Sequence, residues 1–216
     1  MKKFLNIFTC FALIVLLSHC DSQSVEPGNH INFDNMQIGQ QSKYAGYNSR
    51  TPKSDSDTAY SATGDTIVLT VIAKDENGFK ISEESLNKKV KTVYYYFQIA
   101  GDSLFVKPQP GETALGSALI SQKHLSYVLN DNNLPKWTAN QWGVIDQSGV
   151  LKGFGIVENV KILNTNYNSA IAFYDSTEII WDGPAYTKLY SKRSGFISFQ
   201  TTGYFAPNGN IFYLIP

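Results

Sequence analysis

The residues around Gly78 are of types that bind calcium. Centred on this glycine, the calcium-loop pattern places ligands at Ala73, Asp75, Asn77 and Glu84. Asp75, Asn77 and Glu84 carry oxygen ligands, so they form a candidate calcium site with an incomplete ligand set. Ala73 supplies no ligand at the first position, and the flanking residues alternate like a strand. Because Asp, Asn and Gly are also favoured in hairpin turns, a turn is the simpler interpretation.

A nucleophile activated by histidine is not indicated. Beyond residue 20 the sequence has only His30 and His124, and it contains no G-x-S-x-G motif. Ser85 and Lys88 match S-x-x-K, but a chain this rich in Ser and Lys contains such matches by chance. Zinc ligands and a glycine-rich phosphate-binding loop are missing as well. We therefore assign no catalytic residue and no cofactor.

Paired carboxylates are the remaining source of catalytic chemistry. Glu83 adjoins Glu84, and Asp175, Glu178 and Asp182 follow one another closely. Two carboxylates can hydrolyse a glycosidic bond, one acting as the acid and the other as base or nucleophile. Adjacent glutamates usually form a solvated face, however, and Asp182 opens an Asp-Gly-Pro turn. A carboxylate-dependent hydrolase is therefore kept as an alternative.

Aromatic residues give the best indication of binding. Trp137, Trp142 and Trp181 lie near expected loops or strand ends, and Tyr94 and Tyr96 share the amphipathic face of an expected strand. Such rings can stack on a sugar or cover an apolar pocket. The alternative is that they cap the core, since tryptophan is mostly buried in folded proteins.

Cys20 is a candidate for covalent attachment of lipid. The chain starts with Lys2 and Lys3, followed by a mostly apolar run at 4–17, which is typical of an export signal. This run is shorter than the about 20 residues that span a bilayer. Of the two cysteines, Cys10 belongs to the leader, so the exported chain cannot form an internal disulfide.

The residues just before Cys20 resemble a lipoprotein cleavage box. Leu17 stands three positions before the cysteine, and Ser18 is small, whereas His19 departs from the preferred Gly, Ala or Ser. Lipidation would also remove an unpaired thiol from an oxidising compartment. The alternative is ordinary cleavage near Ser22, which would release a free secreted protein. We predict lipidation of Cys20, which implies a membrane partner.

Length and charge limit the remaining classes. We expect a signal peptide at 1–19, a lipid-anchored tether at 20–32 and a single domain at 33–216 with a long loop at about 48–65. Without residues 1–20 the chain has 16 basic and 18 acidic residues, a formal charge of −2. Because no basic run appears, nucleic-acid binding has no electrostatic support.

The body of the chain has the pattern of a β protein. Apolar, β-branched and aromatic residues alternate at 65–74 and 90–99, with core-facing Val93, Tyr95, Phe97 and Ile99 expected in the second run. Further strands are expected at 79–82, 103–108, 143–146, 154–163, 169–175, 177–181, 187–191, 196–201, 204–206 and 211–215. A short helix at 82–89 is possible, and 118–129 fits either helix or strand. The fold class is all-β, an antiparallel sandwich or barrel built largely of hairpins.

Three segments, at 33–47, 64–84 and 182–197, together resemble uncharacterised lipoproteins of Bacteroidota-type bacteria. The resemblance implies an exported all-β domain and carries no activity or catalytic residue. We predict an exported, lipid-anchored protein of the periplasm or outer-membrane surface. Its expected function is non-catalytic binding of a small apolar ligand or glycan. The alternatives are an accessory subunit with an envelope protein as partner, and the hydrolase named above.

Overall fold

The computed structural model describes residues 30–31, 33, 36–49, 60–89, 91–108, 126–128, 132–138, 152–176, 185–202 and 210–215. The predicted signal peptide, Cys20 and most of the tether lie outside these residues, as do the strands expected at 143–146, 177–181 and 204–206.

Every regular element of the described residues is a β-strand, which confirms the all-β prediction. The strands are β1 (Gln41–Ser49), β2 (Tyr60–Lys74), β3 (Gly78–Ser85), β4 (Val93–Ala100), β5 (Ser103–Pro108), β6 (Ser126–Val128), β7 (Lys136–Trp137), β8 (Lys152–Ile162), β9 (Thr165–Ser176), β10 (Ala185–Ser191), β11 (Gly195–Thr202) and β12 (Asn210–Ile215). A search of these residues for a long apolar helix able to cross a membrane finds none.

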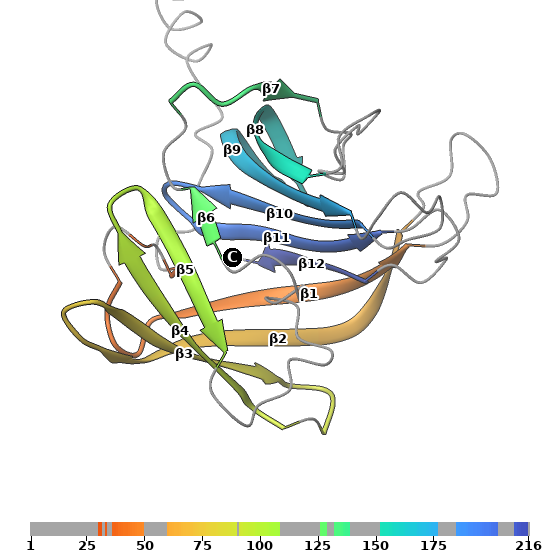
Figure 1. The fold of residues 1–216 in the computed structure, drawn as a ribbon. Coiled ribbons are helices and arrows are strands. Elements are labelled where there is room, and N and C mark those ends of the chain that lie inside the picture. Colours follow the sequence, from red (N-terminus) through yellow and green to blue (C-terminus); the bar gives the residue numbers. More distant parts are fainter. Residues whose placement is uncertain are drawn as a thin grey trace, which may run out of the picture.

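The strands form one open sheet of twelve, in the order β6-β5-β4-β3-β2-β1-β12-β11-β10-β9-β8-β7. Nearly all neighbours are antiparallel and joined as hairpins, as the sequence predicts, and only the short β7 pairs in parallel, with β8. β1 and β12 are the first and last strands of the chain, and they pair with each other near the centre of the sheet (Figure 1).

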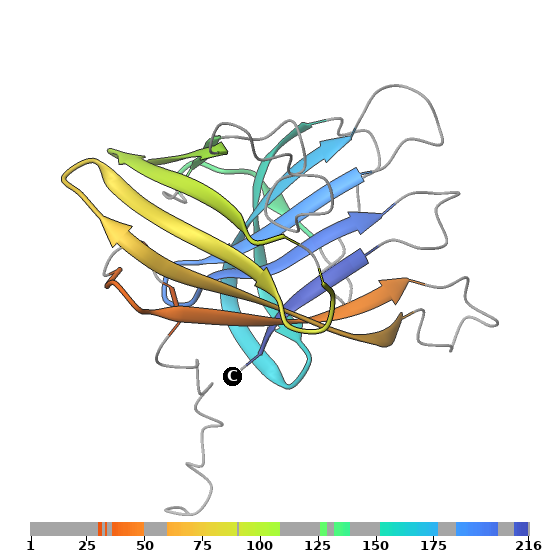
Figure 2. The ribbon, with the colours of Figure 1, turned by 90° about the horizontal axis from the view of Figure 1, so that it is seen from below.

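The sheet curls so that its two halves enclose the core (Figures 1 and 2). In β2 the residues Ile67, Leu69 and Val71 alternate onto the inner face, and in β4 Tyr95 and Phe97 do the same. This period of two is what the sequence shows at both strands, and burial of these side chains holds each strand in register. The core face predicted for β4 is thereby confirmed.

The segment before β1 fills the space between the two halves. Ile31, Phe33 and Met36 are all buried. The ring of Phe33 lies 5.7 Å from that of Phe97 on β4, and 5.5 Å from that of Tyr190 on β10. One side chain thus packs against both halves of the sheet. The packed domain includes Ile31, inside the range that the sequence assigned to the tether.

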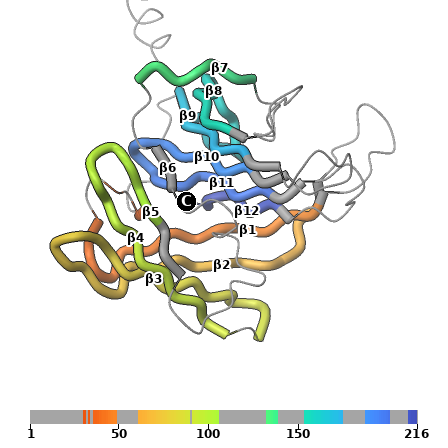
Figure 3. The backbone as a smooth tube through the Cα atoms, in the orientation of Figure 1, coloured from red at the N-terminus to blue at the C-terminus, as the bar shows by residue number. Residues whose placement is uncertain are grey.

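Four short turns lie at corresponding ends of the strands, which we call the turn end, because β2, β4, β8 and β10 run in the same direction in the antiparallel sheet (Figure 3). It comprises the β2–β3, β4–β5, β8–β9 and β10–β11 turns, at 75–77, 101–102, 163–164 and 192–194. Gly101 and Leu163 have positive φ there, as such turns require. The segment that carries Phe33 also enters the core from this end, since Gln40 donates from Nε2 to the carbonyl of His30 at 2.7 Å.

Two expectations from the sequence are wrong. The loop expected at 48–65 is shorter, because β2 begins at Tyr60 and pairs Ala62 with Tyr47 of β1. The start of β2 is polar and rich in Ser and Thr, so its composition resembles that of a loop. It forms a strand because it pairs with β1. The helix considered at 82–89 does not form either. Residues up to Ser85 continue β3, and their backbone bonds go to β2 and β4 instead.

Candidate functional site

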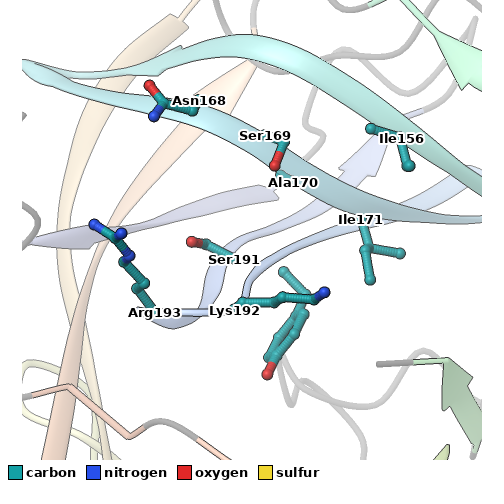
Figure 4. A pocket seen from close by; sticks show the side chains of 9 residues that line it. Ile156, Asn168, Ser169, Ala170, Ile171, Ser191, Lys192 and Arg193 are labelled. Atoms are coloured by element: carbon teal, nitrogen blue, oxygen red, sulfur yellow. The ribbon is translucent and has the colours of Figure 1, made fainter. Parts of the chain in front are cut away.

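A pocket of about 240 Å³ opens beside the turn end, between β9 and the β10–β11 turn. Its lining residues are Ile156, Asn168, Ser169, Ala170, Ile171, Tyr190, Ser191, Lys192 and Arg193. In Figure 4, Arg193 and Asn168 lie at one end of the pocket and Ile156 and Ile171 at the other. The side chain of Lys192 extends toward Ile171, so the two cationic groups point to opposite ends of the pocket.

Three adjacent strands build the apolar side. Ile171 of β9 pairs with Ile156 of β8 on one side and with Tyr190 of β10 on the other. Directly paired residues of antiparallel strands share a face, so the three side chains form one row across the sheet. The ring of Tyr190 packs against the ring of Phe33, with the two centroids 5.5 Å apart. The segment before β1 thus supports the pocket from the core side.

Both cations of the lining come from the β10–β11 turn. Lys192 and Arg193 follow Ser191 at the end of β10, and their side chains are exposed, whereas Ser191 is buried. The register shift between Leu189 and Tyr190 re-aims the end of this strand, as β-bulges do. Two cations and no acidic residue line the pocket.

Among the described residues, Glu158 is an acid that strand pairing places near the pocket, and it forms an ion pair. Glu158 of β8 pairs with Ser169 across the β8–β9 hairpin. Its carboxylate lies 2.7 Å from Nζ of Lys136 on β7. Lys136 lies on β7, which pairs with the edge of β8 that faces away from β9. The ion pair therefore orients the Glu158 carboxylate toward β7.

A second polar group lies inside the core. Tyr95 donates from its hydroxyl to Oε2 of buried Glu83 at 3.3 Å, and Tyr44 donates to the carbonyl of Phe196 at 2.9 Å. Burial raises the pKa of Tyr44, and the charge of Glu83 adds a smaller contribution in the same direction. Buried Glu83 and exposed Glu84 point to opposite faces of β3, so these adjacent acids do not converge. Hydrolysis by that pair is not supported by their geometry.

The calcium candidates are only partly brought together. Oδ1 of Asp75 accepts from the backbone N–H groups of Asn77 at 2.8 Å and Gly78 at 2.9 Å, and from the hydroxyl of Tyr96 at 2.7 Å. Glu84 lies farther along β3, opposite Val68. Within the described parts of the chain, no three His, Cys, Asp or Glu side chains are grouped as metal ligands would be. Asp75 and Asn77 form a hairpin turn there.

The aromatic candidates do not share one site. Tyr94 and Tyr96 lie on the outer face of β4, where Nζ of Lys80 is 5.0 Å from the Tyr94 ring centroid. Trp137 is half-buried on β7, at the opposite edge of the sheet, and its indole covers Gly155 so closely that no Cβ fits there. Trp142 and Trp181 lie outside the described residues.

Little in the sequence indicates the pocket. Lys192 and Arg193 stand in a short turn between two apolar strands, where charged residues are ordinarily solvated. The available signal was two adjacent cations directly after a buried strand end, with a polar Asn168-Ser169 pair on the strand before. Only the pairing of β9 with β10 brings these residues together.

The lining carries amide, hydroxyl, ammonium and guanidinium groups, which are able to form hydrogen bonds and ion pairs. Comparisons with known proteins add no assignment to this geometry. No protein-family model, no curated protein and no solved structure matches the chain.

Proposed function

We propose that this protein is a non-catalytic binding module of the cell envelope that holds a small ligand in the pocket beside the turn end. The observation that carries the proposal is the pocket itself, with an apolar row of side chains facing polar groups. Ligand sites usually combine an apolar lining with a few convergent polar groups, as this one does. An amide and two hydroxyls, from Asn168, Ser169 and Ser191, supply the groups that fix orientation.

Packing supports the proposal because a filled core lies beneath the pocket. The space enclosed by the curled sheet is occupied by Ile31, Phe33 and Met36, which are all buried. Ile171 and Tyr190 belong both to this core and to the lining of the pocket, so the packed interior supports part of the site. A preformed site loses little conformational entropy on binding.

The proposed cellular location rests on residues that precede the described part of the chain. An export signal at 1–19 and an acylated Cys20 would attach the domain to a membrane, facing the periplasm or the outer surface. The resemblance of three segments to Bacteroidota-type lipoproteins fits this location. The proposal therefore joins a membrane-anchored position to a small-ligand site.

Ligand retention tests the proposed function. Protein purified under native conditions is extracted with solvent and the extract is analysed by mass spectrometry, beside a glycan-array screen. We expect a small molecule to accompany the wild-type chain and to be lost in Ser169→Trp, because the indole would occupy the pocket. Asn166→Trp is the matched control, since Asn166 is exposed on the same strand and does not line the pocket.

Two results would contradict this function. One is equal retention by wild type and Ser169→Trp, which would place the ligand elsewhere. The other is a wild-type chain that retains and binds nothing. In that case the accessory-subunit assignment becomes preferable, and co-purification from membranes would identify the partner.

A further inference from the structure

We infer that the turn formed by residues 37–40, together with the neighbouring end of β2, rests on the bilayer to which the chain is anchored. The exposed side chains of Ile38 and Ile72 make the contact, and the partner is the lipid surface itself. This inference rests on the proposed acylation of Cys20. It goes beyond ligand binding, because it assigns a second interaction surface.

The first observation is an isoleucine at the tip of this turn. The N–H of Gln40 donates to the carbonyl of Gln37 at 3.1 Å, so Ile38 and Gly39 are the two central residues. Gly39 has a φ of +88°, as the third position of a type II turn requires. The side chain of Ile38 beside it is 64% exposed. Turn positions favour Gly, Pro, Asn, Asp and Ser, so turn chemistry does not account for a large apolar side chain here.

The end of β2 presents a second exposed isoleucine beside the turn. The N–H of Gly39 donates to the carbonyl of Val71 at 2.8 Å, and the N–H of Val71 donates to the carbonyl of Gln40 at 3.0 Å. These bonds hold the turn against the residue that precedes Ile72, whose side chain is 39% exposed. Figure 2 shows the start of β1 beside the end of β2. Two adjoining segments of backbone therefore each carry an exposed isoleucine.

The chain enters the fold at the same turn, which selects a bilayer as the partner. Nε2 of Gln40 donates to the carbonyl of His30 at 2.7 Å, and its Oε1 accepts from the N–H of Gln37 at 3.3 Å. One glutamine thus links the apolar turn to a point ten residues after Cys20. A tether of that length spans about 17 Å on average by random-coil scaling. An acylated Cys20 would therefore hold Ile38 close to the lipid.

Anchoring makes a small apolar contact sufficient. Two isoleucines would not hold a free protein on a bilayer, since even one myristoyl chain gives only marginal, reversible binding. An anchored domain meets the bilayer as an intramolecular partner, at a high effective concentration. Transfer of the two side chains from water to the lipid interface is then favourable. The contact orients a domain that the acyl chains alone would leave free to rotate.

The charges at this end favour an apolar contact over an electrostatic one. Exposed Lys74 is followed in the chain by exposed Asp75 and Glu76. Anionic lipids would attract the lysine and repel the two acids, so these charges give such lipids no advantage. We therefore expect the contact on vesicles of phosphatidylcholine alone, with little dependence on salt.

Quenching by nitroxide-bearing lipid tests the contact, with the acylated protein reconstituted into phosphatidylcholine vesicles. Gln37→Cys carries a fluorescent label beside Ile38, because Gln37 is exposed and acylation would consume the thiol of Cys20. Ala62→Cys is the matched label site, since Ala62 is exposed at the opposite end of β2. We expect the label at 37 to be quenched at least about twofold more than the label at 62, because interfacial side chains lie within reach of the acyl chains.

A double variant assigns the contact to the two isoleucines. Ile38→Ser with Ile72→Ser should reduce quenching at 37 to the level at 62, because it removes the exposed apolar surface. Leu86→Ser is the control, since Leu86 is 60% exposed just beyond the far end of β3 and should leave quenching unchanged. All three positions are exposed, so these variants should keep the fold, and equal urea midpoints check this.

The outcomes separate this inference from the proposals on which it depends. Equal quenching at the two label sites of the acylated protein overturns the lipid contact and leaves the anchor standing. Quenching at 37 that survives Ile38→Ser with Ile72→Ser has the same consequence. A chain without acyl groups overturns anchor and contact alike, while Ser169→Trp still tests the ligand pocket. A protein that shields the label at 37 in place of lipid would also overturn the inference, because the turn would then be a protein-docking site.

Discussion

Asp75 shows how one side chain organises a turn. A single oxygen, Oδ1, accepts hydrogen bonds from Asn77, Gly78 and Tyr96. These bonds favour the charged form, so the pKa of Asp75 is lowered, with the hydroxyl of Tyr96 as the largest cause. The pKa of Tyr96 is raised by the same bond. The turn is thereby tied to β4, which lies beyond the next strand in the chain.

Removing that hydroxyl should move the titration of Asp75. In Tyr96→Phe we expect the pKa of Asp75 to rise toward its ordinary value, because the largest stabilising bond to the carboxylate is lost. Carbon-detected NMR titration of the carboxyl group measures this shift. Since the native pKa is the depressed one, its contribution to stability is present above the unfolded-state pKa and is lost as pH falls through the native pKa.

Tyr94→Phe is the control for this titration, because Tyr94 lies on the same face of β4 and makes no bond to Asp75. An unchanged Asp75 titration in Tyr96→Phe would contradict the assigned cause. The sequence predicts the Asp-x-Asn-Gly turn from local preferences. It cannot predict the partner, since Tyr96 lies 21 residues away and meets Asp75 only through strand pairing.

The segment before β1 acts as an element of the core although it has no regular structure. Phe33 contacts Phe97 on one half of the sheet and Tyr190 and Phe196 on the other. Its backbone is fixed nearby, where the N–H of Ile31 donates to Oγ of Ser42 at 2.8 Å. These contacts join strands that are distant in the sheet order and also support the floor of the pocket.

Truncation of Phe33 should destabilise the whole domain. In Phe33→Ala we expect a loss of about 3–5 kcal/mol in the free energy of unfolding, because a buried ring is replaced by a cavity. Urea denaturation, read as a lower midpoint at unchanged slope, measures the loss. Ile38→Ala is the control, since Ile38 is 64% exposed in the same segment and should change stability by less than about 0.5 kcal/mol. Similar midpoints for the two variants would contradict the role of Phe33 in the core.

Strands were predictable where the sequence alternates strongly. β2 and β4 carry β-branched and aromatic residues on a buried face, and both were located from that pattern. β1 was missed because its inner face consists of Ser42, Tyr44 and Gly46, of which only the tyrosine is large. Pairing with β2 and β12 on either side forms this strand. Single-strand patterns contain no such information, and the pocket was missed for the same reason.

At the scale of the molecule, an open sheet must protect its edges from pairing with other chains. The edge strands here are short, since β6 has three residues and β7 has two. Short edges are one means by which natural sheets avoid aggregation. The short edge strands therefore offer few backbone groups to a strand of another chain.

Attachment of the molecule is tested by metabolic labelling with a radioactive fatty acid. We expect label in the wild-type protein and none in Cys20→Ala, because the thiol would be the acylated group. The variant should also leave the membrane fraction, since stable anchoring depends on several acyl chains. Ser24→Ala is the control that preserves the thiol. Equal label in wild type and Cys20→Ala would refute the anchor.

The entry point of the chain into the fold limits how far the domain can lie from the proposed anchor. His30 contacts the start of β1 at the turn end, ten residues after Cys20, and a fully extended chain of that length reaches at most about 36 Å. The β10–β11 turn belongs to the same end. If Cys20 is acylated as proposed, the strand ends that carry this turn would stay within that distance of the bilayer surface.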